Sequence, residues 1–239
     1  MRLCLIPLHI EPGSPAENIR RFSTILDQVR EQHPDLVCLP ECSFTGYMYE
    51  DADLARFAEP VPGPTTAEMA RLAQVHGIYL CFGLLESTPQ GVYDTALLLD
   101  RRGTIISHHR KLSEKPPFIN GTAVESVGTE CRSRWSPDRD KLFAEEGVAR
   151  LARALQLLLV PTARSFDGQS PDRARWEREE RQSYLDAVHH TGVSAAITNT
   201  LETSPEDALF GGALLVSAQG ELLAESPHGS DEILIYDLD

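Results

Sequence analysis

The sequence has few cysteines and places them far apart. Its 239 residues include five cysteines, at positions 4, 38, 42, 81 and 131, and no two of them form a CxxC pair. An odd and scattered set is typical of free thiols in a reducing compartment. It argues against a disulfide framework and against a cysteine zinc site, and we therefore expect a cytoplasmic protein.

Long apolar runs and net positive charge are missing too. No apolar run approaches the roughly 20 residues that a membrane-spanning helix needs, and the N-terminal "MRLCLIPLHIEPG" predicts a strand rather than a signal peptide. The formal net charge is −14, and an acidic surface is repelled by nucleic acids and by anionic membranes. The sequence thus predicts neither a nucleic acid nor a membrane as partner, and the charge leaves a small-molecule substrate open.

Repeats, low-complexity tracts and linkers are also absent, so we expect one domain over residues 1–239. Short apolar runs predict buried strands at residues 2–9, 35–41, 78–86, 92–100, after the turn at Gly103, and at 155–163, 192–200, 210–225 and 232–239. Amphipathic or capped stretches predict helices at 14–32, 65–76, 145–154 and 171–190, the first with a capping box of Ser14 and Glu17. Residues 122–140 are polar and predict no regular element. The order predicts an α/β fold with a mixed sheet between helices.

Ionisable residues stand at the ends of several predicted strands. Glu41 ends the strand in "LPECSFTGY", Lys111 follows another in "HHRKLSE", and Asp138 and Asp140 precede the helix expected near residue 145. Strand ends in α/β sheets commonly line the ligand crevice. A glutamate and a lysine that meet there can act as general base and oxyanion stabiliser in an attack on an amide or nitrile.

Four segments, which include Glu41 and Lys111, follow one another along the chain in the order that is typical of one enzyme family. They are "LPECSFTGY", "HHRKL", "LFAEEGVARLARALQLLLVPTA" and "FGGALLVSAQGELLAESPHGSDEILIYDLD". Together they resemble the nitrilase-like carbon–nitrogen hydrolase superfamily, and the ordered set is more specific than any single motif. The resemblance implies a four-layer α-β-β-α sandwich that forms a homodimer. It also implies amidase-type hydrolysis of a small amide, nitrile or carbamoyl group by a Glu–Lys–Cys triad, through a thioester and without metal or cofactor.

The resemblance places roles on single residues. It implies that Glu41 is the general base and that Lys111 supports the tetrahedral intermediate. A further glutamate of the family follows the lysine, before a Phe and a Gly, and "EKPPFING" offers Glu114, Phe118 and Gly121 for this pattern. Glu114 lies only three residues beyond Lys111, so this match is looser.

The nucleophile segment departs from the family pattern. That pattern reads about C-x-D-x-R-F-P-E after an apolar strand, and the same register puts its Asp on Asp140, its Phe on Phe143 and its last Glu on Glu145. Asp138 then stands where the family has its cysteine. The preceding stretch "ECRSRWSP" is polar and ends in Pro137, so the strand and the turn differ as well as the nucleophile.

Two residues are candidates for the attacking group. Asp138 is one, because carboxylates form covalent intermediates in other enzymes; toward an amide, however, a carboxylate is a poor nucleophile and would form a mixed anhydride. Cys131 is the other, with a thiolate that Lys111 would favour, although we favour a free cysteine on an irregular segment. Cys42 adjoins Glu41, but neighbouring residues on a strand face opposite ways.

Two rival interpretations remain beside hydrolysis. A non-catalytic homologue would bind a small amide-like ligand or a protein partner with the same residues, since function depends on the site rather than on the fold. A metal-dependent phosphoesterase would need a set of Asp, His and Asn ligands. The pairs His108–His109 and His189–His190 invite that idea, but no ligand set has metal-site spacing, and we expect no metal.

Overall fold

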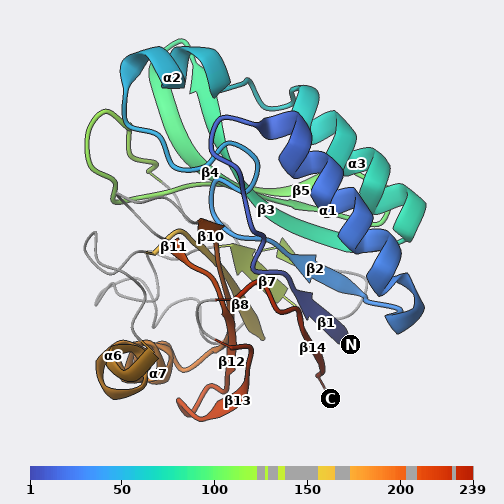
Figure 1. Cartoon of the computed structure of the whole chain (residues 1–239), viewed down its shortest axis with the longest axis vertical. Helices are drawn as coiled ribbons and strands as arrows, with labels where there is room; N and C mark the ends of the chain where they lie inside the picture. Colours follow the sequence, from blue (N-terminus) through green and yellow to red (C-terminus); the bar gives the residue numbers. More distant parts are fainter. Residues whose placement is uncertain are drawn as a thin grey trace.

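The computed structural model describes residues 1–122, 127–128, 134–137, 156–164, 173–202, 209–227 and 230–238. Within these residues the strands form two six-stranded sheets and one two-stranded pair (Figure 1). None of the described helices is long and apolar enough to cross a membrane.

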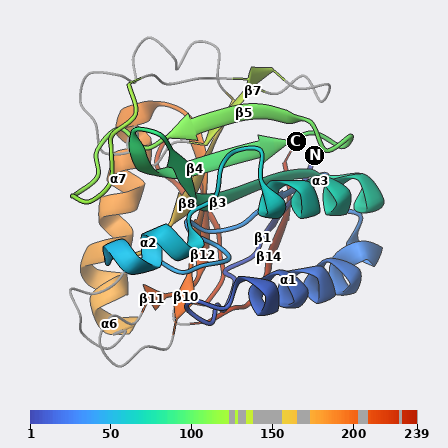
Figure 2. The same ribbon diagram turned by 90° about the horizontal axis from the view of Figure 1, so that it is seen from above.

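The first sheet is built from the N-terminal half of the chain and closed by its C-terminal strand. Its strand order is β14-β1-β2-β3-β4-β5, with β1, β2 and β3 parallel and the other pairs antiparallel. The strands are β1 (Arg2–Leu5), β2 (Leu36–Cys38), β3 (Tyr79–Thr88), β4 (Gly91–Leu99), β5 (Ile105–Arg110) and β14 (Leu234–Asp237). The pairing of β14 with β1 brings the two termini together (Figure 2).

The second sheet comes from the later part of the chain. Its order is β13-β12-β9-β8-β7-β6, with β7, β8 and β9 parallel. The strands are β6 (Val127–Gly128), β7 (Arg134–Pro137), β8 (Leu157–Thr162), β9 (Ser194–Asn199), β12 (Ala213–Val216) and β13 (Leu222–Glu225), while β10 (Leu201–Glu202) and β11 (Leu209–Phe210) form the separate pair. The parallel strands of the two sheets end close to each other: the backbone N–H of Glu41, after β2, donates to the carbonyl of Thr162 at the end of β8.

Helices lie on the outer face of each sheet (Figures 1 and 2). The first sheet is covered by α1 (Pro15–Val29) and α3 (Pro64–His76), and the second by α6 (Arg173–Arg175), a π-helical turn (Trp176–Glu180) and α7 (Arg181–Thr191). A short 3-10 turn (Arg30–Gln32) extends α1, and α2 (Asp51–Phe57) follows the long turn after β2.

Strand alternation explains why the molecule has four layers. Successive side chains of a strand point to opposite faces, so Cys4 of β1 packs toward α1 and α3, while Leu3 and Leu5 face the other sheet. Leu158 and Val160 of β8 likewise pack toward the second helical layer, with Leu157 and Leu159 turned inward. Three apolar interfaces therefore separate four layers, and the predicted α-β-β-α sandwich is confirmed.

Two helices predicted from the sequence, at residues 65–76 and 171–190, are confirmed. The helix predicted at 65–76 is α3, and Gly77 ends it with a left-handed φ of +66°. Trp176 and Tyr184 are buried and anchor the otherwise polar helical segment against the second sheet. Gly192 ends that segment with a φ of +65°.

Other predictions are wrong, each for a physical reason. The capping box does not form, because the Ser14 side chain makes no capping bond and Glu17 pairs instead with Arg20, at 2.5 Å. The sequence missed α2. The segment expected to be irregular contains β7, which pairs in parallel with β8. Backbone pairing to a neighbouring strand thus outweighs the polar character of "RWSP".

The backbone of β3 approaches the turn after β2 closely at Gly83. A Cβ on Gly83 would lie 2.7 Å from Glu41 Cα and 2.8 Å from the Cys42 backbone nitrogen. We expect Gly83→Ala to lower the free energy of unfolding by about 1–3 kcal/mol, because the backbone must move to admit the methyl group, as measured by urea denaturation.

The matched control is Gly77→Ala, at a glycine with open space around its Cβ position and a φ of +66°. It tests backbone strain without collision, at a cost of about 1 kcal/mol. If Gly83→Ala costs no more than this control, the close approach does not constrain the turn.

Candidate active site

Glu41 lies in the turn after β2, and this turn forms hydrogen bonds with the second sheet. The strand predicted through residue 41 ends earlier, at Cys38, and Glu41 follows it in the turn. Its backbone N–H donates to the Thr162 carbonyl at 3.4 Å, and its carbonyl accepts from the Thr200 hydroxyl at 3.1 Å. Its carboxylate oxygen Oε2 accepts a hydrogen bond of 2.9 Å from the Ala163 backbone N–H. The carboxylate is therefore held at the carboxyl end of β8.

Lys111 directly follows β5 and reaches the same place from the first sheet. Its backbone N–H donates to the Asp94 carbonyl at 2.9 Å. Its ammonium Nζ lies 2.6 Å from Glu41 Oε1 and 3.3 Å from Asp94 Oδ2, and it also pairs with Glu114 Oε1. Both Glu41 and Lys111 are buried. The structure thus brings together the Glu41, Lys111 and Glu114 that the sequence singled out.

Glu114 is positioned by its own loop and by Tyr47. Its backbone N–H donates to Asn120 Oδ1 at 2.7 Å, and its carboxylate Oε2 accepts a 2.5 Å hydrogen bond from the Tyr47 hydroxyl. The Tyr47 ring packs edge-on against Phe118, with centroids 5.5 Å apart. Burial, and then the charges of Asp94 and Glu41, raise the pKa of Tyr47, so its hydroxyl stays a donor to Glu114.

Asp94 is a site residue that the sequence analysis missed. It lies on β4 with the side chain buried, and its Oδ2 is 3.3 Å from both Lys111 Nζ and the Tyr47 hydroxyl. A signal was present, because a lone charged residue precedes the apolar run "TALLL" in a strand. A buried carboxylate in such a strand needs a hydrogen-bonding or charged partner. Lys111, which directly follows the neighbouring strand β5, is in reach.

The described cysteines are buried. Burial, and then the charges of Asp94 and Glu41, raise the pKa of Cys42, whose side chain packs against Leu54 and Phe118. Burial also raises the pKa of Cys4, to about 12. The Cys42 and Cys4 thiols therefore remain protonated at neutral pH, which makes them unsuitable as nucleophiles.

Both candidates for the attacking group, Asp138 and Cys131, lie outside the described residues. The strand before Asp138 is described: β7 ends at Pro137, which is level with Leu159 of β8. β7 also lies against β4 and β5 of the first sheet, the strands that carry Asp94 and precede Lys111.

A second ionic cluster lies on the opposite face of β4 and β5. Glu86 accepts two hydrogen bonds from Arg110, at 2.8 and 2.6 Å, one from Thr95 at 2.8 Å, and contacts His108 Nε2 at 2.9 Å. Burial alone would raise the pKa of Glu86, but the hydrogen bonds from Arg110, His108 and Thr95 outweigh it and lower the pKa to about 2. Glu86 is therefore ionised, and it secures the end of β5 next to Lys111.

The histidine pairs form no metal site in the described part of the chain. His108 contacts Glu86, whereas His109 is buried on the other face of β5. His189 and His190 each contact a backbone carbonyl, of Gln219 and Asp186. Among the described residues, no group of three His, Cys, Asp or Glu side chains is arranged to hold a metal ion.

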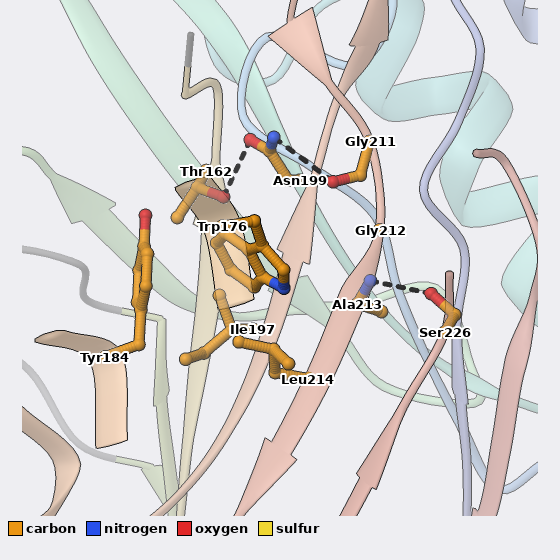
Figure 3. Close-up of a pocket in the computed structure, with 10 residues that line it drawn as sticks. All are labelled: Thr162, Trp176, Tyr184, Ile197, Asn199, Gly211, Gly212, Ala213, Leu214 and Ser226. Carbon is orange, nitrogen blue, oxygen red and sulfur yellow. Dashed lines mark hydrogen bonds between the residues drawn. The ribbon is translucent and has the colours of Figure 1, made fainter. Parts of the chain in front are cut away.

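A small pocket lies between the second sheet and its helical segment, and Thr162, at the end of β8, is one of its lining residues (Figure 3). Trp176, Tyr184 and Leu214 form apolar walls. Its polar side chains bond within the wall: Asn199 Oδ1 accepts from the Thr162 hydroxyl at 3.0 Å, and its Nδ2 donates to the Gly211 carbonyl at 3.3 Å. These bonds hold the end of β8, which binds Glu41.

Comparisons of the sequence with known proteins identify relatives along nearly the whole chain. The sequence model of the carbon-nitrogen hydrolase family matches residues 4–142. The omega-amidase NIT2 of Homo sapiens is 26% identical over 250 residues, which cover 98% of this chain and 87% of the relative. The NIT2 of Danio rerio is also 26% identical over 250 residues, covering 98% and 86%.

Solved structures share the fold at lower sequence identity. An amidase of the nitrilase superfamily from Nesterenkonia AN1 superposes with a TM-score of 0.82 at 22% identity, covering 100% of this chain and 92% of that one. Saccharomyces cerevisiae Nit3, a member of the same superfamily, has a TM-score of 0.84 at 18% identity, covering 100% and 90%.

The Glu86 cluster should make the free energy of unfolding depend on pH. We expect Glu86→Gln to lower the free energy of unfolding at pH 7 by about 1–3 kcal/mol, because charge-assisted hydrogen bonds are lost. The folded pKa of about 2 lies below the ordinary 4.5, so this contribution is fully present above pH 4.5 and is lost as the pH falls toward 2. Urea denaturation at several pH values measures the difference.

The control is Glu17→Gln, at a partly exposed glutamate whose ion pair among the described residues is with Arg20 of the same helix. It should cost much less than Glu86→Gln. A difference between wild type and Glu86→Gln that stays constant from pH 7 to pH 3 would contradict an ionised Glu86.

Proposed function

Because the chain belongs to the carbon-nitrogen hydrolase family, we propose that it acts on the carbon–nitrogen bond of a small amide at the site of Glu41, Lys111 and Glu114. The main support for this proposal is the 2.6 Å contact between the buried Glu41 carboxylate and the buried Lys111 ammonium. Both residues follow strands of the first sheet, and Glu41 also contacts the second sheet. The names of the relatives, omega-amidase and amidase, support an amide as substrate class.

Each of these groups has a distinct role in the proposed reaction. A nucleophile bonds to the amide carbon, and Glu41 takes up its proton where it carries one. The Lys111 ammonium stabilises the oxyanion that forms on the amide oxygen. As the C–N bond breaks, the nitrogen takes a proton from Glu41 and leaves as ammonia. That proton is the nucleophile's own or, where the nucleophile is a carboxylate, one that Glu41 has taken from a water molecule. Water activated by Glu41 cleaves the acyl intermediate, while Glu114 holds Lys111 in place.

The direction of β7 separates the two candidate nucleophiles. Trp135 is level with Leu157, about 17 Å along the strand before Thr162, and Pro137 is level with Leu159, about 10 Å before it. The end of β7 at Pro137 is therefore nearer than its start to the carboxylate held at Ala163. In the sequence Asp138 directly follows Pro137, whereas Cys131 precedes Arg134. We therefore assign the nucleophile position to Asp138.

A second function follows from that assignment. In a relative's structure, the acetamide moiety of fluoroacetamide is added covalently at an active-site cysteine. A carboxylate at the equivalent position is a poor nucleophile toward an amide, which favours a homologue that binds a small amide without hydrolysing it. Ammonia release by the wild-type protein distinguishes the two functions.

We expect hydrolysis to depend on Glu41. Glu41→Gln should lower ammonia release from butyramide and from ω-amides of dicarboxylic acids by about 10²–10⁴-fold, because general-base catalysis is lost. Glu17→Gln is the matched control and should keep the wild-type rate. Equal rates in wild type and Glu41→Gln would contradict the role of Glu41, and no wild-type ammonia release would support the non-catalytic homologue.

We also expect a thiol at position 138 to react with amide-like probes. Asp138→Cys should increase ammonia release over wild type, and mass spectrometry after fluoroacetamide treatment should find the adduct on residue 138. Cys131→Ser should leave the wild-type rate unchanged. If Asp138→Cys gains nothing and forms no adduct, more than the nucleophile has been lost; if Cys131→Ser abolishes activity, the assignment to Asp138 is wrong.

A further inference from the structure

The candidate site contains more negative charge than its one cation balances. Three carboxylates, of Glu41, Asp94 and Glu114, surround the Lys111 ammonium, and the exposed fraction of each of the four side chains is 11% or less. With all four ionised, the local charge would be three negatives and one positive, a net of −2. Like charges that share a buried site cannot all stay ionised, so one carboxyl group keeps a proton.

The hydrogen bonds indicate which carboxyl group carries that proton. Glu41 has a close donor on each oxygen, Lys111 Nζ at 2.6 Å and the Ala163 N–H at 2.9 Å. Glu114 also has one on each oxygen, from Lys111 and from the Tyr47 hydroxyl. Such close donors stabilise the ionised form of Glu41.

In the described part of the chain, the Lys111 and Tyr47 donors lie farther from Asp94 than from the two glutamates. Its Oδ2 lies 3.3 Å from Lys111 Nζ and 3.3 Å from the Tyr47 oxygen. A tyrosine hydroxyl has a single proton, and Tyr47 gives it to Glu114 at 2.5 Å. The Tyr47 oxygen is then an acceptor toward Asp94, which suits a protonated carboxyl group.

We propose that Asp94 is a further positioning residue of this site, a neutral carboxylic acid that helps to enclose the Lys111 ammonium and lets Glu41 stay ionised. This inference rests on the proposed function for its catalytic meaning, because Glu41 can act as a base only while it is ionised.

The surroundings of Asp94 agree with a neutral acid. Burial is the main cause that raises its pKa, followed by the charge and hydrogen bond of Glu41. Glu114 raises the pKa further, and Lys111 opposes the shift. These are the charged groups that face Asp94 among the described residues, with Tyr47 and Cys42 as neutral neighbours.

Infrared spectroscopy tests the protonation state directly. A protonated carboxyl group has a C=O stretch that is distinct from the carboxylate bands. At pH 7 we expect such a band in wild type, shifted to lower frequency when all aspartates carry ¹³C in the side-chain carboxyl group and absent in Asp94→Asn. A band that shifts instead with ¹³C-glutamate, or no band at all, would overturn the proposal.

Thermal unfolding at pH 7 provides a second measurement. Asp94→Asn replaces a neutral group by a neutral group of the same shape, whereas Glu86→Gln on the opposite face removes a charge held by Arg110. We expect the loss of Tm in Asp94→Asn to be less than half of that in Glu86→Gln, and an equal or larger loss would count against a neutral Asp94. Neither measurement needs turnover, so a protein that releases no ammonia would contradict the proposed function without touching this inference.

Discussion

The site depends on one buried ammonium group. Lys111 Nζ contacts carboxylates from three separate chain segments: the turn after β2, the strand β4 and the loop after β5. A buried charge is tolerated only where partners compensate it, so loss of Lys111 would leave several carboxylates together without a cation. The same attraction that stabilises this part of the fold sets a base and an oxyanion stabiliser side by side.

The two sheets meet at Glu41. The residue comes from the first sheet, yet its backbone and its carboxylate bind Thr162, Ala163 and Thr200 at the strand ends of the second sheet. Gly83 makes this possible, because its lack of a Cβ admits the turn against β3. The position of the carboxylate is thus determined by packing of both sheets, and a change at their contact would alter the site without touching a charged residue.

Adjacent positions on β4 and β5 experience opposite electrostatic environments. Thr95 and Arg110 face outward and satisfy Glu86, whose pKa falls to about 2. Asp94 and Lys111, one residue along each strand, face the other sheet, where burial and neighbouring carboxylates raise the pKa of Asp94. Strand alternation alone separates the two clusters, so one pair of strands holds a fully ionised salt bridge and a carboxyl group that keeps its proton.

Periodicity in the sequence predicted α3 and most strands, because these follow from local patterns. The resemblance to a known family implied the four-layer fold and a shared site for Glu41, Lys111 and Glu114. The dimer, the cytoplasmic location and the single domain stay predictions. Asp94, Tyr47 and β7 were decided by tertiary structure: a polar stretch becomes a strand when a neighbour pairs with its backbone, and a lone aspartate joins a site when the next strand brings a lysine within 3.3 Å. The sequence specifies which groups are present, and long-range packing decides which of them share a charge environment.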